Sequence, residues 1–176
     1  MLAHSQSKKQ NSYRKSSVAV LCDIQNVLRI KDTANFLLDF AKLQGRVDYK
    51  KFYYNSHYPS QVSIKDILET LDFESVDVTD PSLNSADHRL VADCVKLFAP
   101  QHSPIPKIII LVSGDWDYAG LITILQAMDK KVIVFAQKGS ASAKLMNLVG
   151  KNNFYFLDEL PELIKNITQI YVPAIK

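Results

Sequence analysis

Four aspartates that are far apart in the sequence either follow short apolar segments or begin a predicted helix. Asp23 directly follows the segment VAVLC, Asp115 and Asp117 come soon after IIILV, and Asp87 lies near the start of a helical pattern. Two carboxylates about 4 Å apart repel by roughly 4 kcal/mol at an effective dielectric constant of about 20. If these aspartates meet at one place, the sequence predicts a bound cation or carboxyl groups with raised pKa values.

The residues around these aspartates limit which metal they could bind. No histidine or cysteine near them has the spacing of a metal site, so the ligands would be oxygen atoms. Oxygen ligands favour Mg²⁺ or Mn²⁺ over Zn²⁺. These ions serve phosphodiester chemistry because they activate water and stabilise charge on the displaced oxygen. The predicted cofactor is therefore Mg²⁺ or Mn²⁺.

Each of these residues also has an ordinary structural explanation. Asp23 could end a strand, Asn26 could belong to a turn, and an aspartate before a helix stabilises its positive end without any chemistry. Asp93 follows Asp87 by six positions, about 240° around a helix, so the two cannot share one face. We therefore expect Asp93 to form a salt bridge or to support the metal ligands rather than to bind metal itself. Only the coincidence of several strand-end acids indicates a functional site.

The elements that must position these residues alternate between strands and helices. Short apolar runs predict strands at residues 18–21, 47–53, 75–78, 108–112, 132–135 and 154–157. Helical spacing predicts helices at 33–43, 60–71, 86–98, 118–128, 142–149 and 160–167, with Ser85 capping the third. This order predicts a three-layer α/β/α fold with a mainly parallel central sheet of five to six strands. Ligands bind outside the carboxyl ends of such strands, so Asp23 and Asp115 converge if the first and fourth strands are neighbours.

Composition and charge predict one globular domain with short polar ends. The chain has 176 residues, of which 47% are hydrophobic and 22% charged, and this excludes disordered and disulfide-scaffold classes. Four basic residues and no acid stand in the first 15 positions, whereas the other positions hold 17 basic and 18 acidic residues. We therefore predict a disordered basic tail at 1–15, a domain at 16–170 and a C-terminal tail at 171–176.

The cysteines and the apolar runs bear on the compartment. Cys22 and Cys94 lie in apolar runs and are predicted to be buried thiols in a reducing compartment. The polar N-terminus does not look like a signal peptide, and the longest apolar run is far too short to cross a bilayer. The predicted location is the cytoplasm, and no membrane partner is expected. The sequence does not decide whether the last helix forms the interface of a homodimer.

Three segments contain these residues in a specific order. They are Asp23-Ile-Gln-Asn26 after the first strand, Asp87-x5-Asp93 on a helix, and Ser113-Gly-Asp115-Trp-Asp117-Tyr118 after the fourth strand. Together they resemble the NYN domain, a PIN-like nuclease family that includes the LabA-like bacterial proteins. The resemblance extends over roughly residues 17–160. It implies a PIN-like sheet with a central first strand, an acidic pocket for Mg²⁺ or Mn²⁺, and metal-dependent cleavage of RNA.

The resemblance also implies roles for individual residues. Asp23, Asp87, Asp115 and Asp117 would be the catalytic and metal-binding acids, and Asn26 would hold the substrate or the Asp23 carboxylate. The expected substrate-binding residues are Asn26, Arg89, Ser113, Lys138, Ser142 and Lys144.

Two departures from the family pattern favour an alternative function. Asn84-Ser85-Ala86 stands where many members have a Lys-Gly pattern before the helix aspartate, and Asn152 and Asn153 stand where an acid is common. The alternative is a regulatory protein that keeps the acidic pocket but binds RNA or a nucleotide without cutting it.

Basic and aromatic residues after the strands would hold the nucleic acid. Lys138 and Lys144 flank a segment whose backbone N–H groups are predicted to bind phosphate at the start of a helix. One or two of the tyrosines between residues 53 and 58 are expected to be exposed and to stack on bases. Trp116, between two acids, could form the floor of the site or support its loop from below, and packing beneath the loop is the expected role. Because an acidic pocket reaches a splayed backbone more easily than a stacked duplex, single-stranded RNA is the predicted partner.

Two other folds with parallel sheets fit the sequence less well. A phospho-acceptor receiver would have a pair of acids after its first strand, but Cys22 precedes Asp23 here. A dinucleotide-binding domain would have a glycine-rich turn at the same place, and none follows the first strand.

Overall fold

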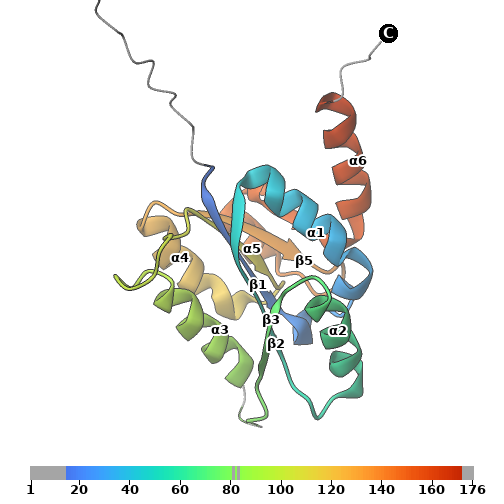
Figure 1. The fold of residues 1–176 in the computed structure, drawn as a ribbon, viewed down its shortest axis with the longest axis vertical. Coiled ribbons are helices and arrows are strands. Elements are labelled where there is room, and N and C mark those ends of the chain that lie inside the picture. Colours follow the sequence, from blue (N-terminus) through green and yellow to red (C-terminus); the bar gives the residue numbers. More distant parts are fainter. Residues whose placement is uncertain (1–14, 81, 83, 172–176) are drawn as a thin grey trace, which may run out of the picture.

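A computed structural model describes residues 15–80, 82 and 84–171. The predicted tails at 1–15 and 171–176 lie outside the described residues, apart from Lys15 and Tyr171. Six parallel strands form the central sheet in the order β3-β2-β1-β4-β5-β6 (Figure 1). Their bounds are β1 Ser17–Asp23, β2 Arg46–Tyr54, β3 Glu74–Asp77, β4 Ile108–Val112, β5 Lys131–Ala136 and β6 Phe154–Phe156. The predicted fold class is confirmed.

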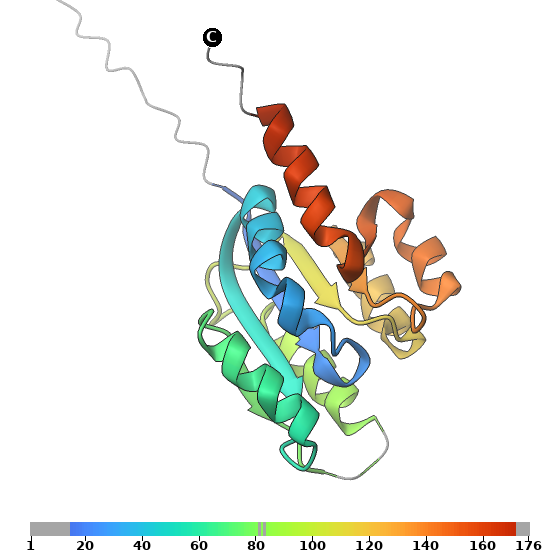
Figure 2. The same ribbon diagram turned by 90° about the vertical axis from the view of Figure 1, so that its right-hand side faces the viewer.

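Three helices cover each face of the sheet (Figures 1 and 2). On one face lie α1 (Ile30–Gln44), α2 (Pro59–Glu69) and α6 (Leu160–Tyr171). On the other lie α3 (Ser85–Lys96), α4 (Ala119–Ala127) and α5 (Ala143–Val149). No helix within the described ranges is long and apolar enough to span a membrane.

The central strands are apolar throughout because both of their faces are buried. Val18, Val20 and Cys22 of β1 pack into the core beneath α1, α2 and α6, whereas Ala19 and Leu21 pack against α3, α4 and α5. This alternation places Asp23 on the side of α3 at the carboxyl end of β1. All residues of β4 are buried as well, which explains the unbroken IIILV segment.

The strand order brings the acidic segment that begins at Asp23 and the acidic segment that follows β4 to one edge of the sheet. β1 pairs with both β2 and β4, and Cys22 lies opposite Val112 in the register of β1 and β4. The residues that follow these two strands therefore leave the sheet side by side. The connections run outward in both directions from β1 and β4, which is the position where α/β sheets bind ligands. A receiver would instead place its second strand at the edge of the sheet, so this order excludes that alternative.

The ends of the helices differ in detail from the sequence-based expectations. Ser85 does not cap α3: Asn84 holds that position with φ of 62°, and the Ser85 hydroxyl donates to the Asp80 carbonyl oxygen. α1 ends before Gly45, where a Cβ atom would overlap the carbonyl oxygen of Ser16. Glycine therefore allows the chain between α1 and β2 to pass close to the start of β1.

Candidate metal and nucleic-acid site

Asp23 is a fully buried carboxylate at the carboxyl end of β1. Its Oδ2 atom accepts hydrogen bonds from Asn26 Nδ2 at 2.6 Å and, with longer contacts, from the hydroxyls of Tyr118 at 3.1 Å and Ser113 at 3.4 Å. Its Oδ1 atom is buried and has no hydrogen-bond partner. A buried oxygen without a partner is costly, and a cation coordinated there would satisfy it.

The electrostatic surroundings of Asp23 disfavour its charged form. Burial raises the pKa of Asp23 from 3.8 to about 6, against the lowering effect of the Asn26 hydrogen bond. The nearby charge of Asp87 adds to the increase, and the hydrogen bond from Tyr118 opposes it. No basic side chain is among the causes of this shift. A divalent cation would supply the missing positive charge, so the donor set fits a hard metal ion.

Three further aspartates gather at the same edge. One carboxylate oxygen from each of Asp87, Asp115 and Asp117 lies within 4.8 Å of the others. Asp87 and Asp115 are half-buried and Asp117 is exposed. The structure thus brings together three of the four predicted acids directly, while the fourth, Asp23, is joined to them through a tyrosine.

Tyr118 is the residue that joins the buried and the exposed acids. Its hydroxyl lies 2.6 Å from Asp87 Oδ1 and 3.1 Å from Asp23 Oδ2. Burial and the two carboxylates raise the pKa of Tyr118, so the hydroxyl keeps its single proton and can donate it to one of the two carboxylates at a time. Tyr118 is the last residue of the segment Ser113–Tyr118, and no role was predicted for it from the sequence. The final aromatic position of that segment was the available signal.

The loop after β4 is held by hydrogen bonds within its own sequence. Ser113 Oγ accepts from the backbone N–H of Asp115 at 3.2 Å, and Asp115 Oδ1 accepts from that of Asp117 at 3.0 Å. Asn84 Nδ2, at the start of α3, donates to Asp117 Oδ2 at 3.0 Å. These bonds order the acidic side chains before any ligand binds.

Gly114 allows the loop after β5 to pack on the acidic loop. A Cβ atom at this position would lie 3.0 Å from Ala141 Cα and 3.1 Å from the Ser140 carbonyl oxygen. We expect Gly114→Ala to lower the free energy of unfolding by about 1 kcal/mol, because backbone atoms would have to shift. Urea unfolding followed by circular dichroism measures this change.

Gly120→Ala is the matched control for Gly114→Ala. Gly120 lies in α4 with nothing within 4 Å of its Cβ position, so alanine should stabilise the protein by up to about 1 kcal/mol. Equal unfolding midpoints for the two variants would contradict the close packing at Gly114.

A hollow of about 280 Å³ opens beside the acids. It is lined by Asp87 and Asp115 together with Gln25, Asn26, Asn55, Tyr58, Asp80, Ser82, Asn84 and Ser85. Tyr53 and Tyr54 are buried, whereas Tyr58 is 54% exposed at the rim of this hollow. The expectation that one or two of these tyrosines are exposed is therefore confirmed.

The sequence matches the model of the NYN domain over residues 17–158. The chain belongs to the NYN domain family. NYN domains are part of the PIN-like superfamily and are generally similar to ribonucleases. The fold is shared by the crystal structure of a protein of unknown function from Vibrio parahaemolyticus, with 27% identity and a TM-score of 0.65. That match covers 85% of this chain and 97% of the other. Curated proteins give no match.

Most basic residues expected at the acidic edge of this NYN domain already have acidic partners. Lys138 Nζ lies 2.7 Å from Glu159, and Arg89 Nε lies 3.3 Å from Asp93. Asp93 thus forms the predicted salt bridge, and Lys96 binds its other oxygen at 3.1 Å.

The segment between β5 and α5 has fewer free backbone N–H groups than the predicted phosphate site requires. The backbone N–H of Ser142 donates to the Gly114 carbonyl, and that of Lys138 donates to Asp158 Oδ2. α5 has only seven residues. Lys144 is different: within the described part of the chain it forms no ion pair, and its Nζ lies 5.8 Å from the centre of the Trp116 ring. It is the strongest phosphate-binding candidate of this segment.

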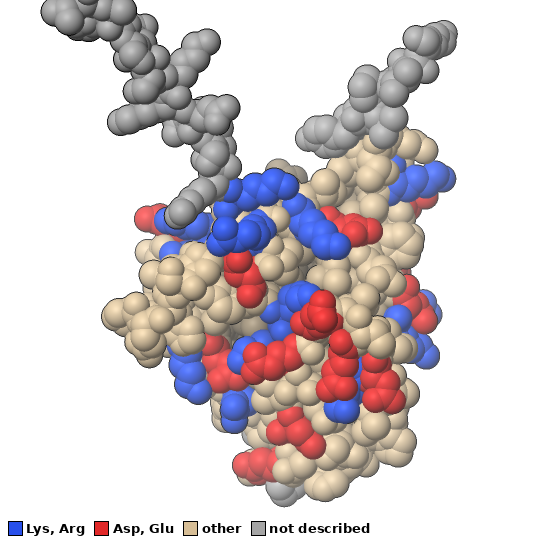
Figure 3. Space-filling view, in the orientation of Figure 1, with Lys and Arg blue, Asp and Glu red and all other residues tan. Residues whose placement is uncertain are grey.

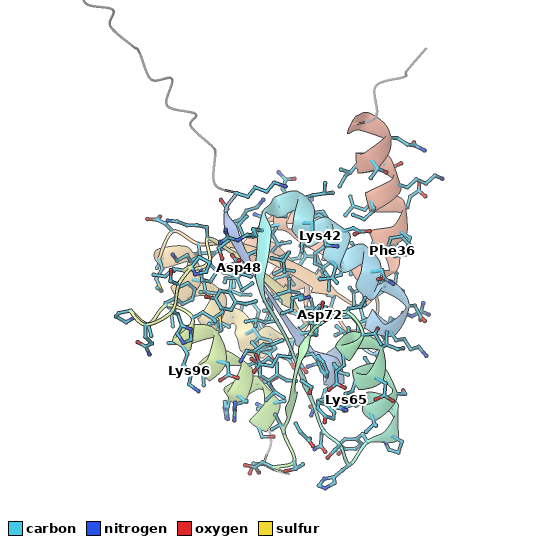
Figure 4. The ribbon with its side chains drawn as sticks, in the orientation of Figure 1. Phe36, Lys42, Asp48, Lys65, Asp72 and Lys96 are labelled. Carbon is cyan, nitrogen blue, oxygen red and sulfur yellow. The ribbon has the colours of Figure 1, made fainter. Side chains whose placement is uncertain are left out.

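A second hollow of the NYN domain lies at the opposite end of the sheet. It has a volume of about 790 Å³, and its lining includes Lys15 before β1, Lys42 at the end of α1, Arg46 and Lys50 of β2, and Asp72 before β3. Lysines and arginines gather on that face near the beginning of the described chain (Figure 3). Lys42 and Asp72 are marked in Figure 4. None of the predicted site residues lines this hollow.

Proposed function

We propose that this NYN domain is a metal-dependent endoribonuclease that hydrolyses phosphodiester bonds in single-stranded RNA with Mg²⁺ or Mn²⁺. The observation that supports it best is the gathering of four acids at one sheet edge, with the buried Oδ1 of Asp23 lacking a partner. NYN nucleases typically depend on divalent metals, and the family implies RNA as the general substrate class.

The proposed roles follow from burial and hydrogen bonding. Asp23, Asp87 and Asp115 would hold the metal, since their carboxylates face one another or share Tyr118. When bound, the ion would lower the pKa of a water molecule and neutralise charge on the phosphate oxygens. Asp117 is the exposed member and would orient that water or complete the ligand set. Asn26 would fix the orientation of the Asp23 carboxylate through its 2.6 Å hydrogen bond.

The predicted substrate-binding residues differ in how readily they could reach RNA. Lys144 has no acidic partner in the described residues and would attract phosphate without breaking an ion pair. Arg89 and Lys138 would have to exchange a carboxylate for a phosphate. Ser113 and Ser142 would act mainly by holding the loops together, because Ser113 Oγ and the Ser142 backbone are already hydrogen-bonded.

A regulatory protein that binds without cutting is the second candidate. It is favoured by Asn84, a neutral amide that donates to Asp117 where many family members have a Lys-Gly pattern. In either case, the unpaired and buried Cys22 and Cys94 agree with a cytoplasmic location.

Metal-dependent turnover distinguishes the two candidates. The purified chain is incubated with an end-labelled single-stranded RNA in Mn²⁺, Mg²⁺ or EDTA, and the products are separated by electrophoresis. Internal cleavage that requires metal and stops in EDTA supports the nuclease. Calorimetric binding of Mn²⁺ without any cleavage would contradict it and support the regulatory protein.

A further inference from the structure

Trp116 is exposed, contrary to the expectation that it packs beneath its loop. It is the only tryptophan of the chain and stands between Asp115 and Asp117. Trp116 and Tyr118 are the first and last residues of a single turn of 3-10 helix, Trp116–Tyr118. The exposed fraction of Trp116 is 42%, whereas Tyr118 is completely buried. Tyr118 holds the turn in the core, so the turn does not need the indole ring for packing. A large exposed aromatic ring beside a cluster of acids needs another explanation.

The ring of Trp116 has a cation beside it. Lys144 Nζ, from the first turn of α5, lies 5.8 Å from the ring centre. At this distance an ammonium group is attracted to the face of an indole. Three other cations near this edge, Arg29, Arg89 and Lys138, are paired with Asp158, Asp93 and Glu159. Trp116 and Lys144 therefore form an aromatic and cationic pair whose charge is not neutralised by a carboxylate in the described residues.

Lys144 and the part of the hollow formed by Asn55 and Tyr58 follow strands on opposite sides of β1 and β4, the strands that the acids Asp23 and Asp115 follow. The hollow is lined by Asn55 and Tyr58, which follow β2. Lys144 follows β5, and β1 and β4 lie between β2 and β5. A nucleic-acid strand that crosses this edge would meet Tyr58, then the acids, then Trp116.

We propose that Trp116 and Lys144 form a nucleotide subsite of single-stranded RNA, in which one unpaired base stacks on the indole and the adjoining phosphate binds the ammonium group. This subsite rests on the proposed function for its substrate class and adds a specificity determinant to it. Stacking on an exposed ring requires a base that is free on at least one face, which a continuous duplex does not offer. Because every base has such a face, the subsite selects single strands without selecting a base sequence.

The fluorescence of Trp116 tests the stacking directly, because no other tryptophan contributes to the signal. An eight-nucleotide oligouridylate is titrated in EDTA, so that no metal-dependent cleavage occurs. We expect saturable quenching by the single strand and little by a blunt duplex of the same length. Quenching of equal size by both, or by neither, would overturn the proposal.

Variants connect the fluorescence to affinity, measured by the anisotropy of labelled oligouridylate. Trp116→Leu, which keeps apolar bulk, should weaken binding about 5- to 100-fold, and Trp116→Phe should restore part of the loss. Lys144→Ala should weaken binding and lower the slope of log affinity against log salt by about one. Lys42→Ala is the matched control, since it removes an exposed lysine at the far end of the sheet (Figure 4) and should bind as the parent does.

The outcomes separate this subsite from the nuclease function. If the parent cleaves RNA with metal and Trp116→Leu binds and cleaves single strands equally well, the subsite is wrong and the nuclease stands. If no metal supports cleavage but quenching and the loss in Trp116→Leu are observed, the subsite stands and the nuclease is wrong. Circular dichroism melting of each variant shows whether the fold is kept.

Discussion

Asp115→Asn should reduce metal-dependent RNA cleavage at least about 100-fold while the protein stays folded. Asp115 contributes an oxygen to the cluster with Asp87 and Asp117, and an amide oxygen carries no net charge to bind a divalent ion. The fold should survive because Asp115 Oδ1 also accepts the backbone N–H of Asp117, and an asparagine oxygen can accept the same bond. Initial rates on a labelled single strand, with calorimetric Mn²⁺ titration, measure both effects.

The control for this variant removes a carboxylate at the other end of the sheet. Asp129 lies before β5 with φ of 55°, a conformation that asparagine adopts readily. Asp129→Asn should therefore leave both cleavage and Mn²⁺ binding unchanged. If Asp115→Asn also keeps full activity, the metal role assigned to this residue is wrong.

Burial determined which elements the sequence predicted best. β4 was predicted with its observed bounds, because a strand covered on both faces must be apolar along its whole length. β3 (Glu74–Asp77) was harder to predict, since it lies at the sheet edge and three of its four residues are polar. Its pairing with β2 includes the ion pair of Lys51 and Glu74, which no apolar pattern reveals.

The acids were predictable because their positions depend only on strand ends and topology. Their partners were not, since a side-chain contact depends on the direction of each side chain. Lys138 pairs with Glu159, which lies 21 positions further along the chain. This ion pair occupies the ammonium group that the sequence had assigned to a phosphate site. Tyr118 and Trp116 are two positions apart, yet one is buried between two carboxylates and the other is exposed. Only the orientation of this turn decides which ring enters the core.

Asp23→Asn should stabilise the metal-free protein at pH 7 by about 1–3 kcal/mol. The pKa of Asp23 is raised from 3.8 to about 6, and each unit corresponds to about 1.4 kcal/mol, so the ionised side chain costs up to about 3 kcal/mol. Asparagine removes the charge and keeps an oxygen for the Asn26 hydrogen bond, but its buried amide would still lack one partner. Urea unfolding in EDTA measures the difference.

The pH dependence of that difference has a definite sign. Because the folded protein holds the Asp23 proton more tightly than the unfolded chain, this group stabilises the fold at low pH, and the stabilisation is lost as the pH rises from 3.8 to about 6. The parent should therefore lose stability relative to Asp23→Asn across this window and show a constant difference above it. A difference that is constant from pH 4 to 7 would show that Asp23 is not strained by its surroundings.

Bound metal should make the parent more stable than Asp23→Asn. A divalent ion that binds the folded parent through Asp23 stabilises it by mass action, by about 4.1 kcal/mol at a concentration one thousand times the dissociation constant. Asp23→Asn lacks the charged ligand and should gain far less from the same Mn²⁺ concentration. The same carboxylate would then destabilise the protein in EDTA and stabilise it in Mn²⁺, which a purely structural buried aspartate would not do. Equal stabilisation of both proteins by Mn²⁺ would mean that the ion binds without Asp23.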